Sequence, residues 1–209
     1  MGDVVIIFSN GISITDAEHK SLLHITPNPE EWLMDAITEK ARVRRDALIK
    51  EWKPKLFNDE SVTELPADAH ALCDLIMARD DYKSRAERIA EDPEASILKH
   101  NIAKFEGTSR VGLTVRRPDR NPNDATVTLF SSGIDLGDED CHCILAYVED
   151  LDDWVIGALM GQINRGRKTM IETWEPIILA DPDVSTMPAT EAGLINMIVA
   201  RDDYKARNN

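Results

Sequence analysis

The chain has 209 residues, of which 43% are hydrophobic and 30% are charged. These fractions are ordinary for a folded globular protein and exclude the composition of a disordered chain. The formal net charge is −14, so phosphate backbones and anionic lipid surfaces would repel the chain. We therefore expect no nucleic-acid partner and no membrane partner. The simpler interpretation of the charge is that it keeps the protein soluble, and the alternative is an acidic mimic of DNA.

Two further features bear on where the protein is made. The first residues are acidic and lack the basic segment and long apolar stretch of a signal peptide. Three cysteines, Cys73, Cys141 and Cys143, are an odd count, and none recurs at the matching position of the internal repeat described next. Both features fit synthesis in a reducing cytoplasm.

An internal repeat dominates the sequence. Residues 1–87 align without a gap onto residues 123–209 at a constant offset of 122, and about 26 of the 87 aligned positions are identical. Such self-similarity predicts repeated structural modules. We predict one module at 1–87, a second at 123–209, and a partly structured connector at 88–122 with a short helix near 94–105 and a strand near 111–115.

Each module begins with a β-rich run, at 5–14 in the first copy and 127–136 in the second. Gly11 and Gly133 interrupt these runs, and glycine supplies a positive φ at no steric cost. The pattern predicts a β-hairpin at the start of each module. Asp16 and Asp138 then follow as candidate caps of a short helix.

A long helix comes next. Apolar residues recur at spacings of three, four and seven between Pro29 and Trp52, and again at the matching positions of the second copy. Pro54 and Pro176 are expected to end these helices, because proline cannot continue a helix. A turn and a closing helix complete each module. The predicted fold class is α+β and mostly helical, with a β-hairpin followed by about three helices in each module.

Four tryptophans lie on or beside the apolar face of the predicted long helices. We expect this set to pack in the core, although aromatic side chains at an interface are the alternative. The set is Trp32, Trp52, Trp154 and Trp174.

The most similar stretch of the two copies is an Arg-Asp-Asp-Tyr-Lys signature at the end of each closing helix. Its residues are candidates for a protein-binding surface or for structural ion pairs within the module. They are Arg79, Asp80, Asp81, Tyr82 and Lys83 in the first copy, and Arg201, Asp202, Asp203, Tyr204 and Lys205 in the second. Apart from the serine at Ser9 and Ser131, which lies in the predicted turn, no His, Cys or Ser is kept in both copies, so we predict no enzyme, no catalytic residues and no cofactor.

The sequence Cys141-His142-Cys143 is the only cluster that resembles a set of metal ligands. Structural zinc sites usually use two more widely spaced ligand pairs, and no second pair is visible. We therefore predict no metal site, and a metal-dependent hydrolase is the least favoured class of function.

In each module a short β-segment precedes a Trp-containing helix that begins after a Pro/Asp-rich turn, at 26–32 and 148–154. With this order of elements the module resembles small accessory proteins of tailed bacteriophages. The resemblance covers residues 1–87 and 123–209 but not the connector. The resemblance implies a virion-associated or assembly role.

We accordingly expect a non-enzymatic phage structural or assembly protein, such as a capsid decoration, neck or tail component. It would be made in the host cytoplasm, would associate with the virion, and would contact other virion or assembly proteins or further copies of itself. The alternative is an early phage protein whose acidic surface binds and inhibits a host factor.

Overall fold

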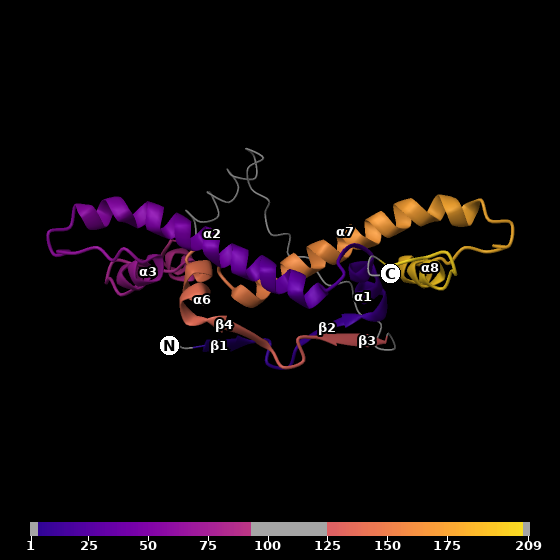
Figure 1. Cartoon of the computed structure of the whole chain (residues 1–209), viewed down its shortest axis with the longest axis horizontal. Helices are drawn as coiled ribbons and strands as arrows, with labels where there is room; N and C mark the ends of the chain where they lie inside the picture. Colours follow the sequence, from indigo (N-terminus) through magenta and orange to yellow (C-terminus); the bar gives the residue numbers. More distant parts are fainter. Residues whose placement is uncertain (1–3, 93–124, 207–209) are drawn as a thin grey trace. The chain divides into compact units, whose positions relative to one another are not determined.

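The computed structural model describes residues 4–92 and 125–206. Within these ranges, seven helices and four short strands form a mostly helical α+β fold, which confirms the predicted class (Figure 1). The first repeat contains β1 (Val4–Ile7), β2 (Ile12–Thr15), α1 (Asp16–Ile25), α2 (Pro29–Phe57), α3 (Ala69–Met77) and α4 (Arg85–Glu91). The second repeat contains β3 (Thr126–Leu129), β4 (Ile134–Gly137), α6 (Asp138–Leu145), α7 (Leu151–Leu179) and α8 (Glu191–Val199).

Most equivalent elements of the two repeats have matching lengths, although α1 has 10 residues and α6 has 8. The long helices α2 and α7 each contain 29 residues, and the closing helices α3 and α8 each contain 9. The N-terminal caps differ in detail. Thr15 and Glu18 form a reciprocal capping box at α1, whereas Gly137 at the start of α6 offers no side-chain cap.

The long helices run past their prolines. The sequence predicted an end near Trp52, but α2 continues to Phe57 with Pro54 inside it, and α7 continues in the same way past Pro176. Proline removes one backbone hydrogen bond but does not prevent a further turn when side chains beyond it are buried. Leu56 in α2 and Ile178 in α7 are both buried, and these contacts hold the last turn in place.

The predicted β-hairpins are wrong, because the strands of one repeat do not pair with each other. β1 pairs antiparallel with β4, and β2 pairs antiparallel with β3. In the first ladder Val4 lies opposite Gly137 and Ile7 opposite Ile134. Each two-stranded sheet therefore takes one strand from each repeat.

The turn between β1 and β2 explains why no hairpin forms. The Gly11 amide donates to the Phe8 carbonyl at 2.6 Å, and the positive φ angles lie at Phe8 (51°) and Gly11 (73°). A two-residue hairpin of the common type needs positive φ at the two central residues, so this turn sends the strands apart. Phe130 and Gly133 repeat the arrangement, with φ angles of 50° and 85°.

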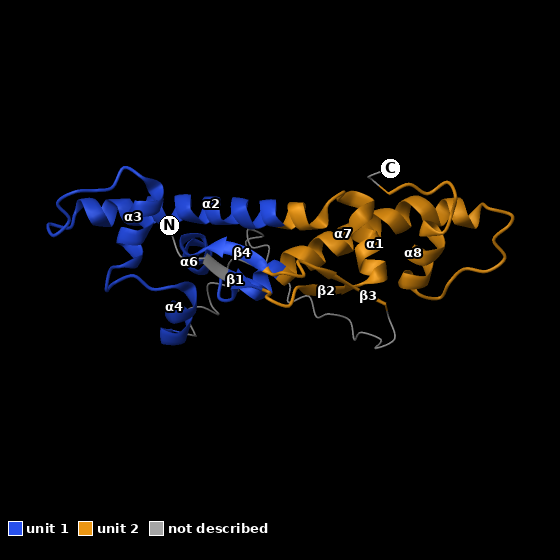
Figure 2. Cartoon of the chain, turned by 60° about the horizontal axis from the view of Figure 1, so that its bottom comes forward, with its two compact units in different colours: residues 1–7, 34–113, 134–155 blue, residues 8–33, 114–133, 156–209 orange. Residues whose placement is uncertain are grey.

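Two compact units result, and neither coincides with a sequence repeat (Figure 2). Unit 1 comprises residues 1–7, 34–113 and 134–155, and unit 2 comprises residues 8–33, 114–133 and 156–209. The division predicted at 87 and 123 follows the sequence repeat, whereas the units follow the exchanged strands and the helices that pack beside them. The helix and strand predicted within the connector lie outside the described residues.

Each unit has its own apolar core, built from helices of both repeats. In unit 1, α2 and α3 of the first repeat pack with α6 of the second, and the buried cluster includes Leu48, Trp52, Leu72, Ile76 and Cys143. In unit 2, α7 and α8 of the second repeat contribute Met170, Ile178, Leu194, Ile195 and Ile198, with Ala17 of α1 packed against them. Because α1 and α6 each pack in a core with helices of the other repeat, the repeats are interdependent.

Candidate functional site

The predicted signature after α3 surrounds one guanidinium group. Arg79 donates from Nη1 to Asp59 Oδ2 at 2.7 Å and from Nε to Asp81 Oδ1 at 2.8 Å. Asp59 also accepts hydrogen bonds from the hydroxyl and the backbone N–H of Ser61. The bonds from Ser61 and from Arg79 lower the pKa of Asp59 to about 2, so this carboxylate is ionised at neutral pH. The arginine thus ties the residues after α3 to the loop after α2.

Unit 2 contains the same arrangement. Arg201 donates to Asp181 Oδ2 at 2.7 Å and to Asp203 Oδ1 at 2.9 Å. The bond from Arg201, with a further bond from the backbone N–H of Asp183, lowers the pKa of Asp181. The two ion-pair clusters therefore perform the same structural task in the two units.

An aromatic pair lies beside each guanidinium. In unit 1 the ring centroids of Trp52 and Tyr82 are 6.0 Å apart, and the Arg79 guanidinium lies 5.9 Å from the Trp52 ring. In unit 2 Trp174 and Tyr204 are 5.6 Å apart, with Arg201 at 6.0 Å. Aromatic pairs and cation–π contacts at these distances add to the stability of the packing.

The structure thus engages part of each signature within its own unit. The arginines and tyrosines are half-buried, and Lys83 pairs with Glu91 at 2.5 Å. Asp80, Asp202 and Lys205 are exposed. Asp81 and Asp203 are also exposed, although they pair with Arg79 and Arg201, so five members remain available to the protein-binding surface predicted from the sequence.

The four tryptophans predicted in the core differ in burial. Trp52 is buried with 5% exposure, and Trp174 packs half-buried against the core of unit 2. Trp32 and Trp154 are only half-buried, and the Lys40 ammonium lies 4.9 Å from the Trp154 ring. The Lys40 side chain is partly buried, and this desolvation lowers its pKa to about 8.

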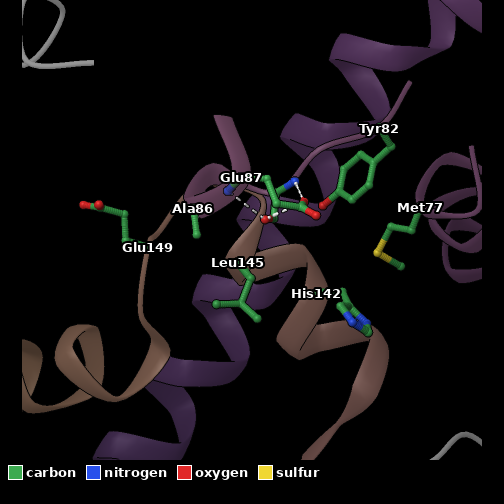
Figure 3. A pocket seen from close by; sticks show the side chains of 8 residues that line it. Met77, Tyr82, Ala86, Glu87, His142, Leu145 and Glu149 are labelled. Atoms are coloured by element: carbon green, nitrogen blue, oxygen red, sulfur yellow. Dashed lines mark hydrogen bonds between the residues drawn. The ribbon is translucent and has the colours of Figure 1, made fainter. Parts of the chain in front are cut away.

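A cavity of about 640 Å³ opens beside Tyr82 in unit 1 (Figure 3). Its wall combines the apolar side chains of Met77 and Leu145 with the polar groups of Tyr82, Glu87 and His142. The Tyr82 hydroxyl oxygen is buried and has no hydrogen-bond partner among the described residues. Burial raises the pKa of Tyr82, so the hydroxyl is neutral at neutral pH.

Three titratable side chains besides Tyr82 line this cavity: Glu87, His142 and Glu149. Glu87 accepts hydrogen bonds from the backbone and the hydroxyl of Ser84 at 2.7 and 2.8 Å, and these bonds lower its pKa. His142 lies 3.4 Å from Asp138 and points to solvent on one side. The cavity thus combines an apolar wall with a histidine and two glutamates.

The Cys141-His142-Cys143 sequence does not form one ligand set. It lies on α6, where consecutive side chains point in different directions, so both cysteines are buried while His142 is exposed. Burial raises the pKa of Cys141 to about 11. The hydrogen bond to Cys73 and burial raise the pKa of Cys143, so both thiols are protonated at neutral pH.

Sequence reasoning missed the exposed apolar residues at the ends of the long helices. Phe57 at the end of α2 is 68% exposed, and Leu179 at the end of α7 is 67% exposed. The two residues occupy equivalent positions of the repeats. The sequence does contain an apolar residue three positions after each proline. These residues were overlooked because both helices were expected to end at the prolines.

No protein-family model, no curated protein and no solved structure matches this chain. Among the residues that the structure describes, no helix combines the length and the apolar character needed to cross a membrane.

Proposed function

We propose that this protein is a non-enzymatic structural or assembly protein that acts through protein–protein contacts. The observation that carries the proposal is the exposure of Phe57 and Leu179 at equivalent positions. Single exposed apolar side chains are common on folded proteins. Here, however, a large apolar side chain is exposed at the same position of two repeats that differ at most of their positions. This exposure is explained if Phe57 in unit 1 and Leu179 in unit 2 each contact a partner protein.

The charged residues of the repeat support the same proposal. Arg79 and Arg201, the guanidinium groups of the shared signature, are both engaged in ion pairs inside their own units. The most similar part of the repeats therefore serves to hold the fold. Function then rests on the surfaces that the fold displays.

The biological setting that we propose is a tailed bacteriophage, on the resemblance of the repeated module to phage accessory proteins. The protein would be made in the host cytoplasm and would join the particle as a decoration, neck or tail component. The described helices include none that could cross a membrane, which is consistent with this setting.

Two measurements test the proposal. Mass spectrometry of purified particles should detect the protein, and cross-linking during assembly should join it to a virion protein. The double variant Phe57→Ser/Leu179→Ser should be incorporated less than the wild type. Val43→Ser is the matched control, because Val43 is an exposed apolar residue of α2 whose equivalent in the second repeat is Arg165. Absence from particles, together with no cross-link to any virion protein, would refute the proposal.

The second candidate is an early phage protein that inhibits a host factor through an acidic surface. The net charge of −14 favours it, because an acidic protein can occupy a basic cleft. This candidate predicts capture of a single host protein that weakens steeply between low and high salt. Capture that is insensitive to salt would count against it.

A further inference from the structure

The last part of α2 carries a stripe of four exposed residues. They are spaced four, three and four positions apart, which places them on one face of the helix. We call this set the α2 stripe: Asp46, Lys50, Lys53 and Phe57. All four are exposed, and Asp46 and Phe57 have exposed fractions of 62% and 68%.

The last part of α7 carries an equivalent stripe, in which each charge has the opposite sign. We call this set the α7 stripe: Lys168, Glu172, Glu175 and Leu179. All four residues are exposed, and the side chains of Lys168 and Glu172 have exposed fractions of 74% and 65%. At the first three positions the charge of one stripe is opposite to the charge of the other, and at the fourth position both stripes have an apolar residue. The two stripes are therefore complementary.

We propose that the α2 stripe of one molecule binds the α7 stripe of a second copy of this chain. This inference deepens the proposed function and rests on it, because it names a second copy as one of the protein's contact partners. The apolar end residues, Phe57 and Leu179, give the contact an apolar part, and the charges give it specificity.

The pattern works for either relative direction of the two helices. When the helices run in the same direction, each residue meets its oppositely charged equivalent, and Phe57 meets Leu179. When they run in opposite directions, Lys50 meets Glu175 and Lys53 meets Glu172, because the spacing of the stripe is symmetric. The apolar end residues then face charged ones, so the contact between Phe57 and Leu179 needs helices that run in the same direction. Two basic residues face two acidic residues in both cases.

Contacts within each stripe do not prevent this pairing. Asp46 lies 3.1 Å from Arg42, and Glu172 lies 3.7 Å from Lys168, both as exposed pairs one helical turn apart. The Lys53 ammonium lies 5.9 Å from the ring of Phe57. Exposed ion pairs of this kind contribute little to stability, so the side chains can exchange partners at low cost.

The contact joins two different surfaces, so it is heterologous. Such contacts produce closed rings of three or more copies, or an open chain of copies, depending on the rotation between neighbours. Like stripes repel each other, which prevents two α2 stripes or two α7 stripes from pairing. The assembly therefore has a direction.

Sedimentation velocity of the full chain over a range of concentrations tests the inference. The wild type should form assemblies at low salt, and these should dissociate as salt screens the charges. Lys50→Glu/Lys53→Glu makes both stripes acidic, and Glu172→Lys/Glu175→Lys makes both basic. Each double variant should raise the Kd of association by about tenfold or more.

Mixing provides the decisive control. The two double variants should assemble together although neither assembles alone, because each acidic stripe then finds a basic one. The variant that carries all four substitutions should again assemble by itself, with the net charge of the wild type. Glu64→Lys/Asp183→Lys changes the net charge as Glu172→Lys/Glu175→Lys does, at exposed sites outside the stripes and the signature, and should leave assembly intact.

Two results would overturn the inference. One is a wild type that stays monomeric at all concentrations, which is also the result expected if the stripes pair within one molecule. The other is an assembly that the charge reversals leave unchanged. Neither result refutes the broader proposed function, because mass spectrometry of particles tests that role through other partners.

Discussion

The guanidinium of Arg79 reaches the carboxylate of Asp59, twenty positions earlier in the chain, at 2.7 Å. Arg201 reaches Asp181 across the same separation and at the same distance. These ion pairs fix the loop after each long helix against the turn after each closing helix. They explain why the Arg-Asp-Asp-Tyr-Lys signature is the most similar part of the repeats.

We predict that Arg79→Ala lowers the midpoint of thermal unfolding. The substitution leaves Asp59 and Asp81 without their shared partner and removes the cation beside the Trp52 ring. Asp80→Ala, at the exposed neighbouring position, should leave the midpoint unchanged. Thermal unfolding followed by circular dichroism checks both variants, and equal midpoints would contradict the structural role of Arg79.

Acid should destabilise the protein through the same ion pairs. The pKa of Asp59 is lowered to about 2 in the folded state, from about 3.9 in an unfolded chain. The associated stability is therefore present above about pH 4 and is lost as the pH falls toward 2. Asp59→Asn should make the free energy of unfolding less dependent on pH in this window. Urea titrations at several pH values between 5 and 2 measure the slope, and an unchanged slope would contradict the prediction.

Two glycines of α7 should respond to alanine in opposite ways. A Cβ at Gly166 would lie 2.0 Å from the backbone oxygen of Ser21 in α1, so Gly166→Ala should cost about 1–3 kcal/mol or more. A Cβ at Gly161 would meet nothing within 4 Å, so Gly161→Ala should stabilise the helix by up to about 1 kcal/mol. Chemical denaturation gives both values. A Gly166→Ala variant as stable as the wild type would show that α1 and α7 do not approach so closely.

Cutting the chain between the repeats should leave the fold intact. A protease site inserted between residues 93 and 124 separates the repeats covalently, but β1 still pairs with β4 and β2 still pairs with β3. The fragments should elute together from a sizing column and separate only in denaturant. Two folded fragments that elute separately under native conditions would refute the strand exchange.

The three thiols should react slowly in the folded protein. Cys73, Cys141 and Cys143 are all buried, and burial raises the pKa of Cys141 to about 11. The thiolate is the reactive form. Burial limits access to all three thiols, and the raised pKa values of Cys141 and Cys143 also oppose ionisation of these two, whereas the hydrogen bond with Cys143 lowers the pKa of Cys73. A disulfide reagent at pH 8 should label the native protein slowly and the denatured protein fast. Rapid labelling of the native protein would contradict the burial of α6 in the core.

Local pattern was sufficient to predict six of the seven described helices; α4 (Arg85–Glu91) was not predicted as a separate helix. The apolar spacing around Trp32 and Trp154 identified both long helices, and the starts at Pro29 and Leu151 follow from the preceding polar turns. The ends were missed because a rule about proline was applied without knowing that Leu56 and Ile178 are buried beyond it. Burial of a distant contact is not visible in a local window.

The strand pairing could not be predicted from the sequence. β1 and β3 have nearly the same pattern, so β2 has two suitable partners and local preference does not choose between them. The choice depends on the φ angles at Phe8 and Gly11, which only the folded chain reveals.

The role of the signature residues could not be decided from the sequence either. Their pairing with Asp59 and Asp181 depends on loops about twenty positions away, so the sequence favoured a structural role but left a binding surface open.

The exchange of strands has a consequence for how folding depends on concentration. A chain with a single repeat would have to obtain its missing strand and short helix from a separate molecule, so its folding would weaken on dilution. Joining both repeats in one polypeptide gives each strand a partner at a fixed effective concentration. The sheets therefore close in a first-order reaction, and the protein can stay folded at a dilution where two separate halves would come apart.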